Sequence, residues 1–280
     1  MQFLMEQIWS LKHLILLLII SSCVQIVAGQ SKVGNNTIEI AISGKILATD
    51  NLEHIYVVDS SNVVNQFSSH GKLLHQFSTV KFGPVHSIDA SNPQKILVFY
   101  KSFNTIIILD NTMSEIAKID LQFSDLELEA VCASNQNDIW AYNASNAELV
   151  KLNSRGEITS KTTGLEQFFT DKNLPTYMVE RNNYVFIKTT KNELYIFDTF
   201  GTFYRRIFSE KSGIKDFMVY GNRLICLTLN SQTSEYNMKS WQLDPPLQME
   251  PPPGRIQIRA TPNMRVTLYK DKVEIYKRSK

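Results

Sequence analysis

The stretch Ala90-Ser91-Asn92-Pro93-Gln94-Lys95-Ile96 returns as Ala133-Ser134-Asn135-Gln136-Asn137-Asp138-Ile139, with an offset of 43 residues. Alanine, serine, asparagine and isoleucine occupy the same places in both copies. Each copy leads into a run that is apolar nearly throughout, Ile96-Leu97-Val98-Phe99-Tyr100 and Ile139-Trp140-Ala141-Tyr142. A short polar turn that leads into a buried strand, repeated at such a period, is typical of a repeat protein.

Six units of this kind follow one another along the chain. The strand after the turn begins near the first residue of six apolar runs, Ile55, Ile96, Ile139, Val185, Leu224 and Val266. Successive starts lie about 42 residues apart on average, the length expected for one four-stranded blade of a β-propeller. A second turn in several units contains a glycine, Gly71, Gly156 or Gly201, which supplies the positive φ of a hairpin. Two hairpin signals per unit predict three or four short antiparallel strands in each.

The composition of the strands favours a propeller over a sandwich. A sheet with one wet face alternates apolar and polar residues. Here Ile106-Ile107-Ile108-Leu109 and Leu224-Ile225-Cys226-Leu227 are apolar at every position, as expected when each sheet is covered on both faces by its neighbours. We therefore predict an all-β fold in which residues 36–280 form a single six-bladed β-propeller.

The two ends of the chain predict how the ring closes. The sixth unit ends at Lys280, one strand short. Residues 37–42, Thr37-Ile38-Glu39-Ile40-Ala41-Ile42, offer an unpaired strand before the first unit. This N-terminal strand would complete the last blade and remove two open sheet edges that otherwise promote aggregation.

Two units carry a family resemblance. Ile55-Tyr56-Val57-Val58-Asp59, a second strand and then Gly71-Lys72 resemble an NHL-type repeat, in which a strand ends in aspartate and a glycine turn follows. Leu194-Tyr195-Ile196-Phe197-Asp198-Thr199-Phe200-Gly201 is similar. The resemblance implies a six-bladed propeller of the NHL-repeat or TolB-like kind. Such folds host binding proteins, scaffolds and a few enzymes, so the fold does not give the function.

The N-terminus reads as an export signal. Lys12 and His13 precede an apolar run, residues 14–20, that has the length of a signal-peptide core and is too short to span a bilayer. Two exits are open. Cleavage after Val27-Ala28-Gly29 would release residues 1–29 and leave residues 30–35 as a short tether, whereas Ile20-Ser21-Ser22-Cys23 resembles a lipoprotein signal with Cys23 as the lipidation candidate. Both processing sites predict an exported protein in the periplasm, at the outer membrane or on the cell surface.

Charge and cysteine content exclude two classes of protein. The chain has 29 basic and 27 acidic side chains, which argues against nucleic acid as a partner because a phosphate backbone calls for a basic stripe. Three cysteines in 280 residues do not form a disulfide framework. Cys132 and Cys226 are interpreted as small apolar core residues that form no bridge with each other.

The candidate metal ligands are few. Metal-dependent propeller enzymes place their ligands around the central channel, where His86, Asp89 and Glu129 are weak candidates. Strand alternation would put Asp125, Glu127 and Glu129 on one side, where a hard cation such as calcium could bind them. The other interpretation is a solvated loop edge. No histidine pair has the spacing of a zinc site.

The unequal connections between units are expected to lie on one face of the ring, where loops carry binding residues. This face is predicted to present a set of aromatic, basic and acidic side chains to a partner: Phe82, His86, Lys101, Phe103, Asp125, Glu127, Phe168, Phe169 and Tyr236. Phe168 and Phe169 have a second interpretation as a cap on the core. The turns that repeat are interpreted as scaffold.

The leading hypothesis is an exported, non-enzymatic propeller, a monomer or one subunit of an envelope complex, that binds a protein, peptide or glycan. The expected cofactor is none, with calcium as the open alternative. The competing hypothesis is a metal-dependent, lactonase-like hydrolase that uses the central channel. A third is a structural lipoprotein component, which requires lipidation of Cys23 and would reach the membrane only through that anchor.

Overall fold

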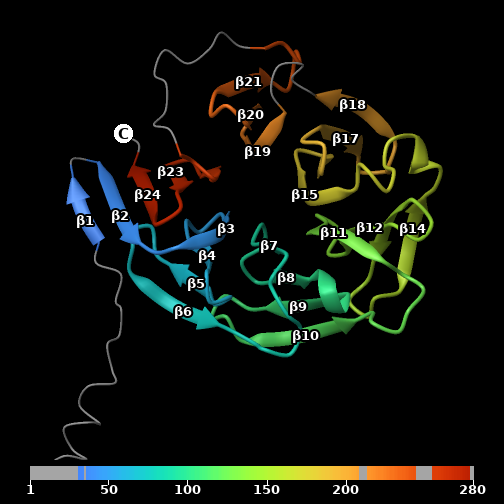
Figure 1. The fold of residues 1–280 in the computed structure, drawn as a ribbon, viewed down its shortest axis with the longest axis horizontal. Coiled ribbons are helices and arrows are strands. Elements are labelled where there is room, and N and C mark those ends of the chain that lie inside the picture. The colour runs from blue at the N-terminus through green and yellow to red at the C-terminus, as the bar shows by residue number, and fades with distance from the viewer. Residues whose placement is uncertain (1–30, 35, 208–212, 244–253, 278–280) are drawn as a thin grey trace, which may run out of the picture.

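The computed structural model describes residues 31–34, 36–207, 213–243 and 254–277. The chain folds into six antiparallel sheets arranged as blades around a central axis (Figure 1). Strands follow one another in sequence within each blade. The all-β, six-bladed propeller predicted from the repeats is confirmed.

The first three blades each contain four strands. Blade one comprises β3 (Gly44–Thr49), β4 (Ile55–Asp59), β5 (Val64–Phe67) and β6 (Leu73–Phe77). Blade two comprises β7 (Ser87–Asp89), β8 (Ile96–Tyr100), β9 (Thr105–Leu109) and β10 (Glu115–Asp120), with the 3₁₀ turn η1 (Lys101–Phe103). Blade three comprises β11 (Leu128–Ala133), β12 (Ile139–Asn143), β13 (Glu148–Leu152) and β14 (Ile158–Thr162).

The last three blades differ in their outer strands. Blade four comprises η2 (Leu165–Gln167), β15 (Pro175–Arg181), β16 (Tyr184–Thr189), β17 (Leu194–Asp198) and β18 (Phe203–Ile207). Blade five has three described strands, β19 (Ile214–Tyr220), β20 (Arg223–Thr228) and β21 (Thr233–Asn237). Blade six comprises β22 (Gln257–Ala260), β23 (Met264–Leu268), β24 (Lys272–Lys277), β2 (Thr37–Ala41) and β1 (Ser31–Gly34).

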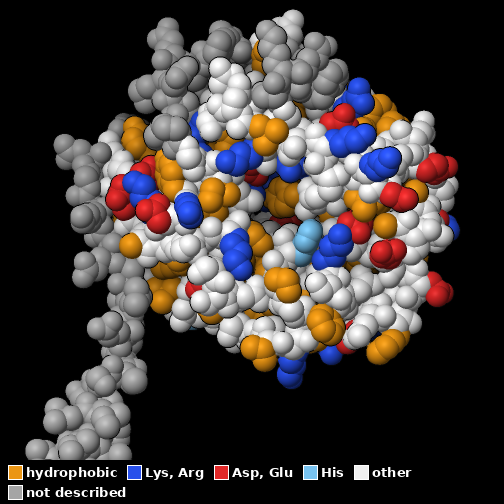
Figure 2. Space-filling view, viewed as in Figure 1, with side chains coloured by type: hydrophobic (Ala, Val, Ile, Leu, Met, Phe, Trp, Pro, Cys, Tyr) orange, Lys and Arg blue, Asp and Glu red, His pale blue; other side chains and the backbone are white. Residues whose placement is uncertain are grey.

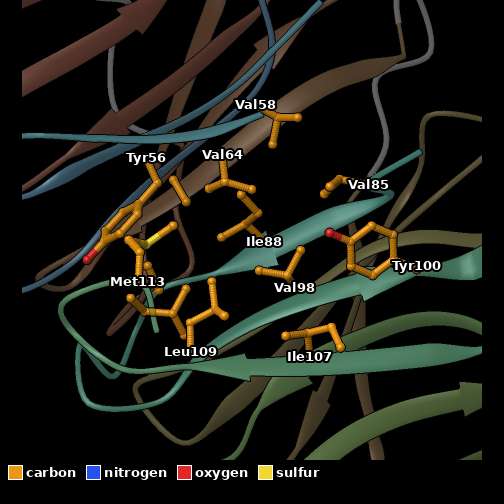
Figure 3. Packing of buried hydrophobic residues seen from close by; sticks show 13 residues of the cluster. Tyr56, Val58, Val64, Val85, Ile88, Val98, Tyr100, Ile107, Leu109 and Met113 are labelled. Carbon is orange, nitrogen blue, oxygen red and sulfur yellow. The ribbon is translucent and has the colours of Figure 1, made fainter. Parts of the chain in front are cut away.

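The core lies between neighbouring blades, because both faces of each middle strand are covered. Every residue of β8, β9, β12 and β13 is buried. Figure 3 shows one such interface, where Tyr56 and Val58 of blade one pack against a blade-two cluster that includes Val98, Ile107 and Leu109. The uninterrupted apolar runs in the sequence are the direct cause of this arrangement.

The predicted ring closure is confirmed. β2 pairs with β24, so that Ile38 lies opposite Ile275 and Ile40 opposite Val273. Lys272 adds an ion pair to Glu39 across the same junction, with 2.8 Å between Nζ and Oε1. β1 occupies most of the segment assigned to a tether and pairs with β2 as a fifth strand.

The meander gives the ring two different faces. The turns between the first and second strands and between the third and fourth strands of each blade lie on one face, here called the turn face. The connections between blades and the turns between second and third strands lie on the opposite loop face. The repeated glycines belong to the turn face, where Gly71, Gly156 and Gly201 have φ of 76°, 79° and 84°.

Side chains join the inner strands of adjacent blades. The backbone N–H of Leu47 donates to Gln257 Oε1 at 2.6 Å, and that of Ile258 donates to Asp216 Oδ2 at 2.8 Å. Likewise, Ala133 N–H donates to an oxygen of Asp89. Asn135 N–H donates to Glu180 at 3.2 Å, and Glu180 also accepts from the Trp140 indole. These bonds satisfy backbone donors at the free edges of the inner strands.

Two further expectations can be placed. Cys132 and Cys226 are both free and buried, which confirms that they form no bridge. Cys23, the expected signal segment 1–29 and the proline run 251–253 lie outside the described residues. No helix in the described parts of the chain is long and apolar enough to cross a membrane.

The closing seam should be sensitive to the loss of one buried side chain. We expect Ile275→Ala to lower the free energy of unfolding by about 2–5 kcal/mol, because it removes a fully buried isoleucine from the β2–β24 junction. Ile116→Ala is the matched control, since that isoleucine is 52% exposed on β10, and it should change stability by less than about 0.5 kcal/mol. Chemical denaturation measures both. Equal losses of stability in the two variants would contradict a contribution of the β2–β24 junction to the stability of the ring.

Candidate functional site

The first strands of the six blades lie around the central axis of the ring (Figure 1). The space between them is here called the central channel, and its two ends are the loop-face mouth and the turn-face mouth. At the loop-face mouth a β-bulge recurs near the start of these strands. The bulge lies at Lys45, Glu129, Thr176 and Lys215, where the register with the second strand shifts by one residue. In blade two, His86 N–H bonds to Phe99 O while Ser87 also pairs with Phe99. Bulges re-aim a side chain, so five blades present an irregular residue at this mouth.

Basic groups outnumber free acidic groups at the loop-face mouth. Glu129 is 5% exposed and bound by Lys101, with 2.5 Å between Oε2 and Nζ. Lys215 donates to the Arg255 carbonyl at 2.6 Å. Lys45 is exposed, and no described residue pairs with it. Figure 2 looks onto this face and shows Lys and Arg side chains, with one histidine, around the central hollow.

Lys188 adds a partly buried cation between blades four and five. It lies opposite Tyr177 in the β15–β16 pair. Burial lowers the pKa of Lys188, and the nearby Asp216 carboxylate opposes that effect. Asp216 itself is held by Arg259 at 2.8 Å, so among the described residues Lys188 has no ion-pair partner of its own.

His86 of blade two contacts blade four at the loop-face mouth. Its Nε2 lies 3.2 Å from the Thr176 carbonyl oxygen of blade four, which requires the proton on Nε2 for a hydrogen bond. The ring meets Phe99 edge-on, with 5.7 Å between ring centroids. Burial lowers the pKa of His86, and the positive charge of Lys101 lowers it further.

A cavity of about 540 Å³ opens at the turn-face mouth. It is formed by the last residues of all six inner strands and by the turns that follow them, including both Ala-Ser-Asn turns. We call it the turn-face chamber. Its lining includes Tyr177 and Phe217, whose ring centroids lie 5.5 Å apart, together with Arg181 and Arg259. Arg259 lies over Tyr177 at 5.3 Å from the ring centroid, and burial raises the pKa of Tyr177.

The predicted acidic cluster does not form. Asp125 and Glu127 are exposed on the connection before β11, whereas Glu129 is buried. Placing all three on one side is wrong, because the bulge between Leu128 and Ala130 interrupts the alternation at Glu129. Asp89 lies at the opposite end of the channel, where its oxygens accept backbone N–H groups.

No group of three or more His, Cys, Asp or Glu in the described part of the chain could hold a metal ion. A cation bound by Glu129 would compete with the Lys101 ammonium, and one bound by Asp89 would compete with the backbone of Ser91 and Ala133. Calcium binding stays a prediction.

The predicted aromatic residues of the connections and of η1 belong largely to packing contacts, and Phe168 reaches the turn-face ends of β17 and β18. Phe82 is half-buried and lies 5.6 Å from Tyr100 and 6.4 Å from Phe103, between ring centroids. Phe169 is 2% exposed, and Phe168 stacks on Phe203 at 4.5 Å. The interpretation of Phe168 and Phe169 as a cap on the core describes their contacts.

The expected place of Tyr236 is wrong. Tyr236 lies within β21 and pairs with Leu224 near the turn-face end of blade five, because the strand continues through the residues interpreted as a turn. It is partly buried against the cluster between blades four and five.

Sequence reasoning missed Lys45, Lys188, Lys215, Arg181 and Arg259. For Lys45 and Lys215 a signal existed: with His86, Glu129 and Thr176 they recur at the period of the repeats. Nothing in the sequence marks Lys188, Arg181 or Arg259, because their placement depends on contacts between blades.

Comparisons with known proteins support the architecture. No protein-family model matches the chain, and no curated protein matches it. Among solved structures, the Neurospora crassa Pan2 WD40 domain is similar at 12% identity and a TM-score of 0.61, over 85% of this chain and 90% of that one. The β-propeller domain of Myceliophteria thermophila Cps50 (Swd1) is similar at 8% identity and a TM-score of 0.62, over 87% of this chain and 100% of that one.

Virginiamycin B lyase from Staphylococcus aureus is also similar, at 11% identity and a TM-score of 0.58, over 89% of this chain and 100% of that one. At these identities the likeness shows a shared fold. The narrower NHL-repeat or TolB-like kind stays a prediction.

His86 should make stability depend on pH. Because its pKa is lowered in the folded state, the unfolded state binds more protons below about pH 6.5, and stability falls as the pH falls through that range. We expect His86→Gln to lose less stability than the unmodified protein between pH 7 and pH 5, as measured by urea unfolding. Identical pH profiles would contradict the buried, neutral state of His86.

Proposed function

We propose that this chain is an exported, non-enzymatic β-propeller that binds a protein, peptide or glycan at its loop face, around the loop-face mouth. The observation that carries the proposal is the recurring bulge. It presents Lys45, His86 and Lys215 from three different blades at one opening. A rigid ring that aims irregular residues at a common point is suited to recognition.

The charges at this mouth favour an acidic partner. The carboxylates of Glu129 and Asp216 are each neutralised by a cation, Lys101 and Arg259 respectively. The ammonium groups of Lys45, Lys188 and Lys215 have no ion pair among the described residues. Such a surface attracts groups of opposite charge and disfavours basic ones.

Binding is better supported than hydrolysis. The candidate catalytic carboxylates, Glu129 and Asp89, lie towards opposite mouths of the channel and are engaged in internal contacts. The partly exposed Phe103 belongs to η1 with Lys101 and lies 6.4 Å from Phe82 between ring centroids, so apolar and basic groups are available side by side. Mixed surfaces of this kind suit a partner that carries both acidic and apolar groups.

Export and the envelope setting rest on the sequence. The apolar run 14–20 and the two possible processing sites, at residues 27–29 and at Cys23, support transport out of the cytoplasm. We propose that the propeller acts as a monomer or as one subunit of an envelope complex.

A charge reversal at the mouth tests the binding site. We expect Lys45→Glu to reduce recovery of the partner from a native envelope fraction by about tenfold, because it places a carboxylate where acidic groups dock. Lys239→Glu is the matched control: this lysine is also exposed but lies on a turn-face turn. Quantitative mass spectrometry of the captured proteins and glycans is the measurement. Equal recovery with both variants would contradict a loop-face site.

The mature N-terminus tests export. Intact mass spectrometry of the protein purified from its native envelope should show a chain that begins at Gln30, or at Cys23 carrying lipid. A lipid on Cys23 would support the structural lipoprotein alternative. A mature chain that retains Met1 would contradict export through this segment.

A further inference from the structure

The turn-face chamber has the properties of a second binding site. Its volume of about 540 Å³ falls within the range of roughly 300–1,000 Å³ that is usual for small-ligand sites. It combines aromatic walls, Tyr177 and Phe217, with charged and amide side chains from several blades. It lies at the mouth opposite the lysines of the loop face, so it is independent of the function proposed above.

The acidic groups of the chamber are already engaged. Both oxygens of Asp89 accept backbone N–H groups, one from Ser91 at 2.8 Å and one from Ala133 at 2.8 Å. Asp50 bonds within its own turn and accepts the Tyr56 hydroxyl at 2.9 Å. These carboxylates stabilise the turns and offer little to a ligand.

Arg181 is different, because most of its donors have no described partner. A guanidinium has five N–H donors, and one of them, on Nη1, bonds to the Glu180 carbonyl at 2.8 Å. The Glu180 carboxylate points elsewhere, to Trp140 and Asn135. No carboxylate among the described residues lies within ion-pairing distance of Arg181, whereas Arg259 is paired with Asp216.

Amide groups of other blades also line the chamber. Asn51 and Asn135 line the chamber, are exposed, and their side chains make no described hydrogen bond. An amide both donates and accepts, so it can bind a hydroxyl or amide group of a ligand. The hydrogen-bonding groups that remain available to a ligand are therefore the charged N–H donors of Arg181 and the neutral amides of Asn51 and Asn135.

We infer that the turn-face chamber binds a small carboxylic acid. Arg181 would hold the carboxylate in a two-pronged hydrogen bond, the arrangement for which a guanidinium is best suited. The aromatic walls would contact the body of the ligand, and the asparagine rim would bind its hydroxyl or amide groups. A sugar acid and an acidic amino acid share this chemistry.

Isothermal titration with matched probe pairs tests the inference on the full mature chain. The probes are galacturonate with galactose as its uncharged counterpart, and N-acetyl-aspartate amide with N-acetyl-asparagine amide. We expect at least one acid to bind at least tenfold more tightly than its uncharged counterpart, because charged hydrogen bonds distinguish the two. The acid that binds identifies the source, sugar or amino acid.

Four variants separate binding from folding. Arg181→Gln should weaken the acid at least tenfold, and Ser91→Trp, which fills the chamber from its rim, should do the same. Lys239→Gln, an exposed lysine on the turn face that does not line the chamber, should leave acid binding unchanged. If Arg181→Gln does not fold, two other single variants decide the question. Ser91→Trp should still weaken acid binding at least tenfold, and Arg181→Lys should bind the acid with an affinity between those of the unmodified protein and Ser91→Trp. Failure of both acids to bind, equal binding of the uncharged probes, or full binding by Arg181→Gln would overturn the inference.

Discussion

The ring depends on one constraint: the inner strand of each blade has a free edge whose backbone N–H groups must find acceptors. At several junctions a side chain of the neighbouring blade supplies the acceptor, as Gln257 does for Leu47 and Asp216 does for Ile258. Each such bond fixes one blade against the next close to the axis. Together with the apolar interfaces further out, these bonds hold the inner strands in place around the axis.

The two mouths carry different chemistry because they are built from different parts of the blades. At the loop face, the bulges rotate single side chains such as Lys45 and Lys215 out of the regular pattern. At the turn face, no such irregularity is needed, since the strand ends and their Asn-containing turns already surround a cavity. One mouth therefore presents lysines on a broad surface, while the other opens into a cavity lined by two arginines and two aromatic residues.

The fold could be predicted from the sequence because its determinants are local and repeated. The second strands begin within two residues of the predicted positions, as at Ile139 and Tyr184, and the N-terminal strand closes the ring. The sites could not be predicted to the same extent. The predicted position of Glu129 is wrong because of a one-residue bulge. That of Tyr236 is wrong because its strand is longer than the turn-like sequence indicated. Arg181 gains its role only from the geometry between blades, which no single repeat encodes.

The β2–β24 pairing also sets the order in which the molecule can be completed. Residues Glu39 and Lys272, joined at this junction, are 233 positions apart in the chain. A chain that emerges from its N-terminus can pair β2 with β1 early, but the other edge of β2 stays unpaired until β24 has been made. During that interval both rims of the unfinished ring are open to other strands, the state in which multi-strand proteins associate wrongly. Biogenesis of this protein is thus most vulnerable in the period before β24 pairs with β2.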